Sequence, residues 1–210
     1  MTKAIIFDLW GTLVETGIRS PLKQAQSILG IELPFSEYVV RMERALMTRK
    51  FTGLREAFQA VSAEFSLAED EDTLDRLVGM WNSSWMLAQP YVEVKSALTK
   101  LRQNHTLILV SNTDEFSAPR VLEKFQLNEL FEKMFFSFEV GLLKTDPDFF
   151  TEVLHQTNLT ATEVVMVGDS MESDILPAQR AGIKAILVDR RSRRDFSPKI
   201  NNLHQLSALL

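Results

Sequence analysis

The sequence contains no cysteine among its 210 residues. This absence excludes disulfide bonds, thiolate metal sites and thiol nucleophiles, so a reactive side chain must present oxygen or nitrogen. Long apolar runs are also missing, because stretches such as LILV and VVMV are far too short to cross a bilayer. The N-terminal MTKAIIFDLW carries an acid within its first apolar stretch and lacks the apolar core of a signal peptide. We therefore expect a cytoplasmic protein that does not enter a membrane.

A surplus of positive charge is absent as well. The chain has 23 Lys and Arg against 28 Asp and Glu, a formal net charge of −5. This balance gives no electrostatic case for binding nucleic acid or an anionic membrane surface. We expect a small-molecule substrate instead, while the oligomeric state stays open. The length fits one domain, or one domain that carries a compact insertion.

Short apolar runs with the β-branched and aromatic composition of buried strands recur along the chain. They cover residues 4–8, 106–111, 134–138, 164–168 and 185–189. Helical spacing of apolar residues appears between the later runs, as in Val94, Leu98 and Leu101. Strands that alternate with helices predict an α/β fold, a Rossmann-like parallel sheet with helices on both faces. Ligands of such sheets bind at the carboxyl ends of the strands.

Residues 15–89 interrupt this alternation with helical periodicity and no convincing strand. A first helix is predicted to begin at Ser20-Pro21 and to end at Gly30, and Ser36 is predicted to cap a second. Apolar residues at helical spacing predict a third helix from Leu54 and a fourth from Leu74. We therefore predict a core of residues 1–14 and 90–210, with an all-helical domain at 15–89. The basic run at residues 190–194 is expected to be a solvated loop.

Polar residues stand at or just after the ends of the predicted strands. An aspartate after one strand is often only a turn residue or a helix cap. Several such groups in a fixed order along the chain carry more weight, because parallel strands end at one edge of a sheet. They are Asp8 in FDLWGTL, Ser111 and Asn112 in LILVSN, Lys144 in GLLKTDP, and Asp169 and Asp174 in VGDSMESD.

These four motifs resemble those of the haloacid dehalogenase-like hydrolase superfamily, and they span nearly the whole chain. The resemblance implies that Asp8 is the nucleophile, that Lys144 assists it, and that residues 15–89 form a cap. It implies a Mg²⁺ site made by Asp8, the backbone carbonyl of Trp10, Asp169 and Asp174. It also implies phosphate binding by Thr12, Ser111, Asn112 and Lys144. A proline is expected directly after Lys144, where this sequence has Thr145.

The residue types suit that chemistry on independent grounds. A carboxylate nucleophile can form a covalent intermediate and so divide one difficult displacement into two easier ones. The oxygens of a phosphate ester repel such a carboxylate, and a magnesium ion, a lysine and hydrogen-bond donors can offset that repulsion. Asp8 and Asp169 together offer the hard oxygen ligands that Mg²⁺ accepts.

Trp10 departs from the pattern of the phosphatases that the sequence resembles. Those enzymes place a second aspartate here, which protonates the leaving oxygen and later activates water. Loss of a general acid and base costs about 10²- to 10⁴-fold where the leaving group is poor. Halide needs no proton, and the 2-haloacid dehalogenases of the superfamily carry an aromatic residue at this place. Those dehalogenases are metal-free, however, and lack the Gly-Asp pair that this sequence keeps at Asp169.

Three hypotheses follow. The first is a Mg²⁺-dependent phosphatase whose leaving group needs no proton, or whose acid comes from Glu15 or from a residue of the cap. The second is a metal-free 2-haloacid dehalogenase in which Arg41, Arg44 or Arg49 grips the substrate carboxylate. The third is a weakly active or inactive phosphate- or protein-binding module. The two metal-site carboxylates favour the phosphatase.

Overall fold

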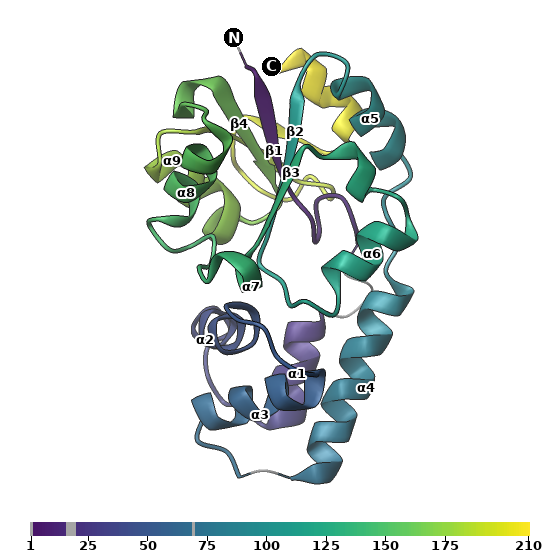
Figure 1. Ribbon diagram of the computed structural model, residues 1–210, viewed down its shortest axis with the longest axis vertical. Coiled ribbons are helices and arrows are strands. Elements are labelled where there is room, and N and C mark those ends of the chain that lie inside the picture. The colour runs from purple at the N-terminus through teal and green to yellow at the C-terminus, as the bar shows by residue number, and fades with distance from the viewer. Residues whose placement is uncertain (1, 16–19, 69) are drawn as a thin grey trace.

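The fold is centred on a parallel six-stranded sheet, seen in a computed structural model that describes residues 2–15, 20–68 and 70–210 (Figure 1). The strand order is β3-β2-β1-β4-β5-β6. Their bounds are β1 Ala4–Asp8, β2 Thr106–Ser111, β3 Lys133–Phe136, β4 Val164–Gly168, β5 Lys184–Val188 and β6 Lys199–Ile200. Strand β1 therefore lies inside the sheet, and the strand order reverses on either side of it.

Alternate residues of each strand pack into two separate cores. In β1, Ile5 and Phe7 belong to one apolar cluster, which also contains residues of α5 (Val94–Leu101) and α6 (Ala118–Lys124). Ala4 and Ile6 belong to a second cluster with residues of α8 (Phe149–Thr157) and α9 (Leu176–Arg180). Because both faces of the sheet are covered by helices, the central strands β1 and β4 carry apolar residues on both faces, up to Asp8 at the end of β1. The predicted fold class is confirmed.

The predicted strands agree with the structure at β1, β2 and β4, and differ at the remaining positions. Strand β3 ends at Phe136 rather than at residue 138, because Ser137 starts the short helix α7 (Ser137–Val140). The Ser137 hydroxyl accepts a hydrogen bond from the Thr113 amide at 2.9 Å and donates to the Thr113 carbonyl at 3.1 Å. Strand β5 begins and ends one residue early, and the two-residue β6 is too short to give a periodic signal.

Helices α1 to α4, which we call the helical insert (residues 20–87), lie together at the carboxyl ends of the strands (Figure 1). Their bounds are α1 Pro21–Leu29, α2 Phe35–Met47, α3 Leu54–Glu64 and α4 Glu71–Leu87. They enclose their own apolar cluster, in which Tyr38, Phe58 and Trp81 are buried. None of the helices in the described ranges is long and apolar enough to cross a membrane.

The structure confirms the predicted ends of α1 and contradicts the predicted cap of α2. Pro21 is the first residue of α1, and Gly30 ends that helix in the left-handed conformation at φ 64°, as the sequence predicts. Ser36 does not cap α2, so that prediction is wrong. The helix begins at Phe35 with Pro34 at the N-cap position, and Ser36 lies inside its first turn. No side chain accepts a hydrogen bond at this helix start, because proline occupies the N-cap position.

The chain passes between the sheet and the insert at two paired segments. Val14 and Pro90 form an antiparallel bridge, and the amide of Glu15 donates to the carbonyl of Gln89 at 3.0 Å.

The remaining short elements are η1 Asn128–Leu130, η2 Ala161–Glu163, the π-helical turn η3 Met171–Ile175 and η4 Leu203–Ala208.

Candidate active site

Asp8 is the last residue of β1, and the strands on its two sides run outward in opposite order. A crevice forms where the order of parallel strands reverses, because the connecting helices leave to opposite faces. The Asp8 side chain is buried, at 5% exposure, and it lines a cavity between the sheet and the insert. Because Asp8 ends β1 at this crevice, its carboxylate can reach a ligand in the cavity.

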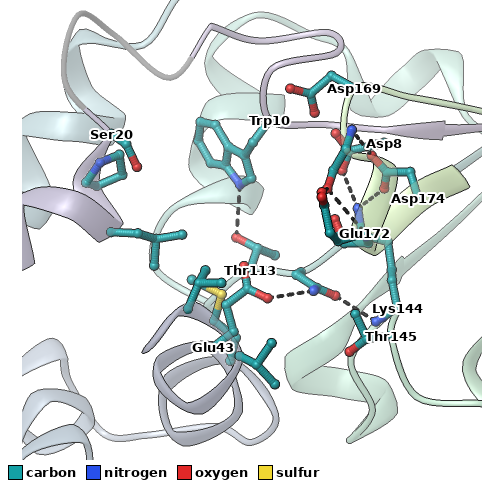
Figure 2. Close-up of a pocket in the computed structure, with 18 of the residues that line it drawn as sticks. Asp8, Trp10, Ser20, Glu43, Thr113, Lys144, Thr145, Asp169, Glu172 and Asp174 are labelled. Carbon is teal, nitrogen blue, oxygen red and sulfur yellow. Dashed lines mark hydrogen bonds and ion pairs between the residues drawn. The ribbon is translucent and has the colours of Figure 1, made fainter. Parts of the chain in front are cut away.

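Lys144 bridges two of the buried carboxylates. Its ammonium group donates to Asp8 Oδ1 at 2.6 Å and to Asp174 Oδ1 at 2.5 Å (Figure 2). Burial alone lowers the pKa of Lys144, but the charges of Asp174 and Asp8 outweigh it and raise that pKa above its usual value. The lysine is therefore a fixed positive charge beside Asp8, and it cannot act as a base near neutral pH.

Asp8, Asp169 and Asp174 form a cluster in which one oxygen from each lies within 4.8 Å of the others. Burial and the nearby charge of Asp174 raise the pKa of Asp8 to about 6, against the opposing effect of Lys144. Burial and the charge of Asp8 raise the pKa of Asp169 to about 8. Two buried carboxylates and the partly buried Asp169 share one lysine, so the cluster has an excess of negative charge that a metal ion can offset.

Two glycines allow the carboxylates to pack this closely. A side chain on Gly11, which has φ 83°, would meet the Asp169 carboxylate at 2.4 Å. A side chain on Gly168 would meet the Asp174 carboxyl group at the same distance. Glycine is thus required at both places by space, and at Gly11 by the backbone as well. These are the glycines of the first and fourth sequence motifs.

The remaining predicted phosphate ligands occupy different depths. Asn112 lines the cavity, and its side-chain oxygen accepts the Lys144 amide at 2.9 Å. Thr12 is fully buried, and among the described residues its hydroxyl has no hydrogen-bond partner. Ser111 is buried behind Asn112, with its hydroxyl 3.5 Å from the Asn112 carbonyl. The phosphate-binding roles stay predictions, and Asn112 is the member of this set on the cavity wall.

Thr145 also lines the cavity, in the turn where the family pattern has proline. The Asp146 carboxylate holds this turn by accepting the Leu143 amide at 2.8 Å. A hydrogen bond therefore does here what a fixed proline φ would do, and Lys144 keeps its position.

Trp10 lines the cavity beside Asp8, and its indole donates a weak hydrogen bond to the Thr113 hydroxyl at 3.4 Å (Figure 2). No proton can be supplied from this side chain near neutral pH. Glu15, the acid proposed from the sequence near this strand, is exposed and stands outside the cavity lining. Neither Trp10 nor Glu15 therefore supplies the missing acid.

The cavity has a volume of about 570 Å³. Its insert wall is mostly apolar and is made by Pro21, Leu22, Phe35, Val39, Val40, Met47, Trp81 and Trp85, with three serines. One charged side chain of the described insert joins them: Glu43, on α2. Sequence reasoning did not single out Glu43. It is one of two acids on an amphipathic helix, and no local sequence feature distinguishes the one that faces the sheet.

The cationic residues considered for the dehalogenase hypothesis lie elsewhere. Arg41 pairs with Glu64 at 2.7 Å, and Arg44 pairs with Asp146 at 2.6 Å. Arg49 stacks on Phe51, 4.8 Å from the ring centre. None of these three arginines lines the cavity. A carboxylate substrate would therefore find none of them there.

The basic run at residues 190–194 does not behave wholly as a solvated loop, so that expectation is wrong in part. Arg190 is partly buried, pairs with Glu93 at 2.7 Å and donates to the carbonyl of Thr12. Arg194 is exposed yet donates to the carbonyl of Asp169 and lines the cavity. Both arginines thus hold the backbone of segments that carry the acidic cluster.

The insert is tied to the core beside the site. The Asn112 side-chain amide donates to Glu43 Oε2 at 2.8 Å, and the Trp81 indole donates to Asp114 Oδ2 at 2.9 Å. Asp114 also accepts from the Phe116 amide at 2.8 Å. The insert is thereby positioned by polar contacts to the loop after β2, next to the cavity.

Fold and site together define an enzyme of the α/β class with an acidic centre at the switch point of its sheet. A family model described as haloacid dehalogenase-like hydrolase matches residues 2–182. The chain belongs to this family, as the sequence motifs predict.

Named relatives and solved structures are similar over long stretches. Glyceraldehyde 3-phosphate phosphatase of Methanothermobacter thermautotrophicus is 26% identical over 228 residues, which cover 100% of both chains. Phosphoglycolate phosphatase of Aliivibrio fischeri is 37% identical over 97 residues, 46% of this chain and 42% of that protein. A crystal structure of 2-haloacid dehalogenase from Pseudomonas syringae pv. tomato superposes with a TM-score of 0.69 at 24% identity. It covers 100% of this chain and 98% of that one, and it shows the shared fold alone.

Proposed function

We propose that this protein is a phosphatase that uses Asp8 as its nucleophile and hydrolyses a small phosphorylated metabolite. One observation carries the proposal: a buried carboxylate with a free oxygen at the switch point of the sheet. Asp8 Oδ1 is fixed by Lys144, while Oδ2 is buried and has no hydrogen-bond partner among the described residues. The phosphatase names of the relatives support the same reading.

The acidic cluster fits a magnesium ion. Its donors are hard carboxylate oxygens, and the unpartnered Asp8 Oδ2 leaves one of them available. Asp8, Asp169 and Asp174 would hold the ion, together with the backbone carbonyl of Trp10. A tryptophan at position 10 is compatible with that ligand, because a carbonyl needs no particular side chain. When bound, Mg²⁺ would neutralise phosphate charge and hold the phosphoryl group in place.

The side chains of this protein would do the remaining work. An oxygen of Asp8 attacks the phosphorus, and the ester oxygen leaves as the new bond forms. Water then releases phosphate from the aspartyl phosphate and regenerates Asp8. Lys144 keeps its positive charge beside the phosphoryl group throughout, and Asn112, Ser111 and Thr12 are the proposed hydrogen-bond donors to it.

We propose further that the helical insert is a cap which closes the site, with core residues 1–14 and 90–210 and cap residues 15–89. The bridge between Val14 and Pro90 supports these boundaries, because it marks two crossing points that lie side by side. Location in the cytoplasm fits the same proposal, because a phosphorylated metabolite is an intracellular substrate.

The dehalogenase alternative has Trp10 in its favour, but two observations weigh against it. A metal-free enzyme has no use for Asp169 beside Asp8 and Asp174. The arginines that would grip a carboxylate, Arg41, Arg44 and Arg49, are held in other contacts. An inactive module has equally little use for a buried nucleophile with a free oxygen.

The test is hydrolysis of p-nitrophenyl phosphate by the full chain. We expect activity that requires Mg²⁺, stops with EDTA and falls by about 10⁴-fold or more in Asp8→Asn, which keeps the shape and removes the nucleophile. Chloride release from 2-chloropropionate that EDTA does not affect, without phosphatase activity, would overturn the proposal in favour of the dehalogenase. Absence of both activities would support the inactive module.

A further inference from the structure

The proposed reaction needs proton transfers that Trp10 cannot carry out, so another residue must handle these protons. In phosphoryl transfer, the attacking and the leaving oxygens lie roughly in line through phosphorus. Asp8 attacks from the sheet side, so the leaving oxygen departs on the opposite side, toward the insert. The water that later attacks the aspartyl phosphate must come from that same side. A group that handles both protons therefore belongs on the insert wall of the cavity.

Glu43 is the acidic side chain that the described part of the insert places on that wall. Helix α2 directs it toward the loop after β2, where its Oε2 accepts from the Asn112 amide at 2.8 Å (Figure 2). The other end of the Asn112 side chain accepts the Lys144 amide at 2.9 Å, and Lys144 in turn donates to Asp8. Two side chains thus link Glu43 to the nucleophile and fix it on the same cavity.

We propose that Glu43 is the general acid and base of this enzyme, supplied by the insert in place of a carboxyl group at position 10. The inference rests on the proposed phosphatase function. In the first step Asp8 bonds to phosphorus, the ester P–O bond breaks, and the Glu43 proton moves to the leaving oxygen. In the second step Glu43 takes a proton from water, the water oxygen bonds to phosphorus, and the bond to Asp8 breaks. Phosphate is released and Glu43 is protonated again.

The electrostatic surroundings of Glu43 suit both steps. Burial raises its pKa to about 7, against the opposing effects of the Asn112 hydrogen bond and the Lys144 charge. Asp174 and Asp8 are the acidic groups that act on it across the cavity, and both raise the pKa further. Arg44, the next residue on the helix, pairs with Asp146 instead. A carboxyl group that is partly protonated near neutral pH can serve as acid and as base.

Glu43→Gln tests the inference, because glutamine keeps the shape and can still accept from Asn112 but cannot transfer a proton. We expect kcat/KM for an alkyl phosphate, which reports the first step, to fall by about 10²- to 10³-fold. For p-nitrophenyl phosphate, whose leaving group needs no proton, kcat/KM should change less than about tenfold. Its steady-state kcat should fall while a burst of one equivalent of nitrophenol appears, because the aspartyl phosphate now accumulates. The limb near pH 7 should disappear from the pH profile of kcat.

Glu37→Gln is the matched control, since Glu37 lies on the same helix, is exposed and stands outside the cavity. Equal losses of kcat/KM for both substrates, without a burst, would overturn the inference and make Glu43 a positioning residue. If Glu43→Gln does not fold, Glu43→Asp is the second variant, because it keeps the carboxyl group. It should retain the wild-type preference between the two substrates. A shift of this preference toward aryl phosphates without a burst would again overturn the inference. An Asp8→Asn variant that retains activity would instead refute the phosphatase function itself, so the two failures are distinguishable.

Discussion

The two walls of the cavity are built on different principles. The core wall carries the buried charges Asp8, Lys144 and Asp174, fixed by strand ends and by direct ion pairs. The insert wall carries apolar side chains such as Phe35 and Val39, with Glu43 as its charged member among the described residues. Preorganised charge is costly to bury and must be held rigidly to be useful, whereas apolar surface tolerates change. We therefore expect the core wall to carry the chemistry and the insert wall to select the substrate.

The same contrast bears on which substrates fit. Lysine and arginine are absent from the insert side of the cavity over the described residues 20–68 and 70–87. A second anionic group on a substrate would meet apolar carbon and Glu43 there, which disfavours it. An uncharged, apolar leaving group would instead be removed from water by this wall. We therefore expect the core to bind the phosphoryl group and the insert to bind the rest.

The largest expected effect comes from weakening the charged wall. Asp169→Asn removes one carboxylate from the acidic cluster, so the Mg²⁺ concentration for half-maximal hydrolysis of p-nitrophenyl phosphate should rise by about 10²-fold or more. Asp195→Asn is the matched control, because Asp195 is exposed and outside the cavity. An unchanged Mg²⁺ midpoint in Asp169→Asn would mean that the cluster does not hold the ion.

A second effect comes from placing an acid on the core wall. Trp10→Asp should raise kcat/KM for alkyl phosphates more than for aryl phosphates. We expect a gain of up to about 10²-fold in the Glu43→Gln background, equivalent to about 2.7 kcal/mol, and about tenfold in the parent. Loss of the indole opens space beside the site and would depress both substrates together.

Trp10→Phe controls for the lost indole, since it keeps one aromatic ring, removes the rest of the indole with its long hydrogen bond to Thr113, and adds no acid. The ratio of alkyl to aryl rates is the decisive measurement. If Trp10→Asp folds, binds Mg²⁺ and keeps the parental ratio in both backgrounds, the carboxyl group at position 10 is not what the reaction lacks.

The core wall was largely predictable from the sequence, and the insert wall was not. Asp8, Lys144 and Asp169 follow or end elements whose carboxyl ends must meet in a parallel sheet, so local patterns fix their convergence. Glu43 follows Met42, which is buried in the core of the insert. The helical periodicity indicates which residues face that core, but not which residues face the sheet. Its direction toward the sheet depends on how the insert is placed by the bridge between Val14 and Pro90, which are far apart in sequence.

The smallest expected effect lies on the apolar wall. Val39 is partly buried and lines the cavity, and Val39→Thr keeps its shape while exchanging one methyl group for a hydroxyl. KM for an aryl phosphate should rise by about three- to tenfold, because roughly 1 kcal/mol of binding free energy from apolar contact is lost. The kcat should stay nearly unchanged. Val92→Thr makes the same exchange at a residue that is 99% exposed and outside the cavity, so its KM should stay at the parental value. The hydroxyl should matter less for a small polar substrate such as glycerol phosphate, whose leaving group gains little from apolar contact. Equal KM changes for both substrates, or a fall in kcat alone, would show that Val39 shapes the position of the insert instead of binding the leaving group.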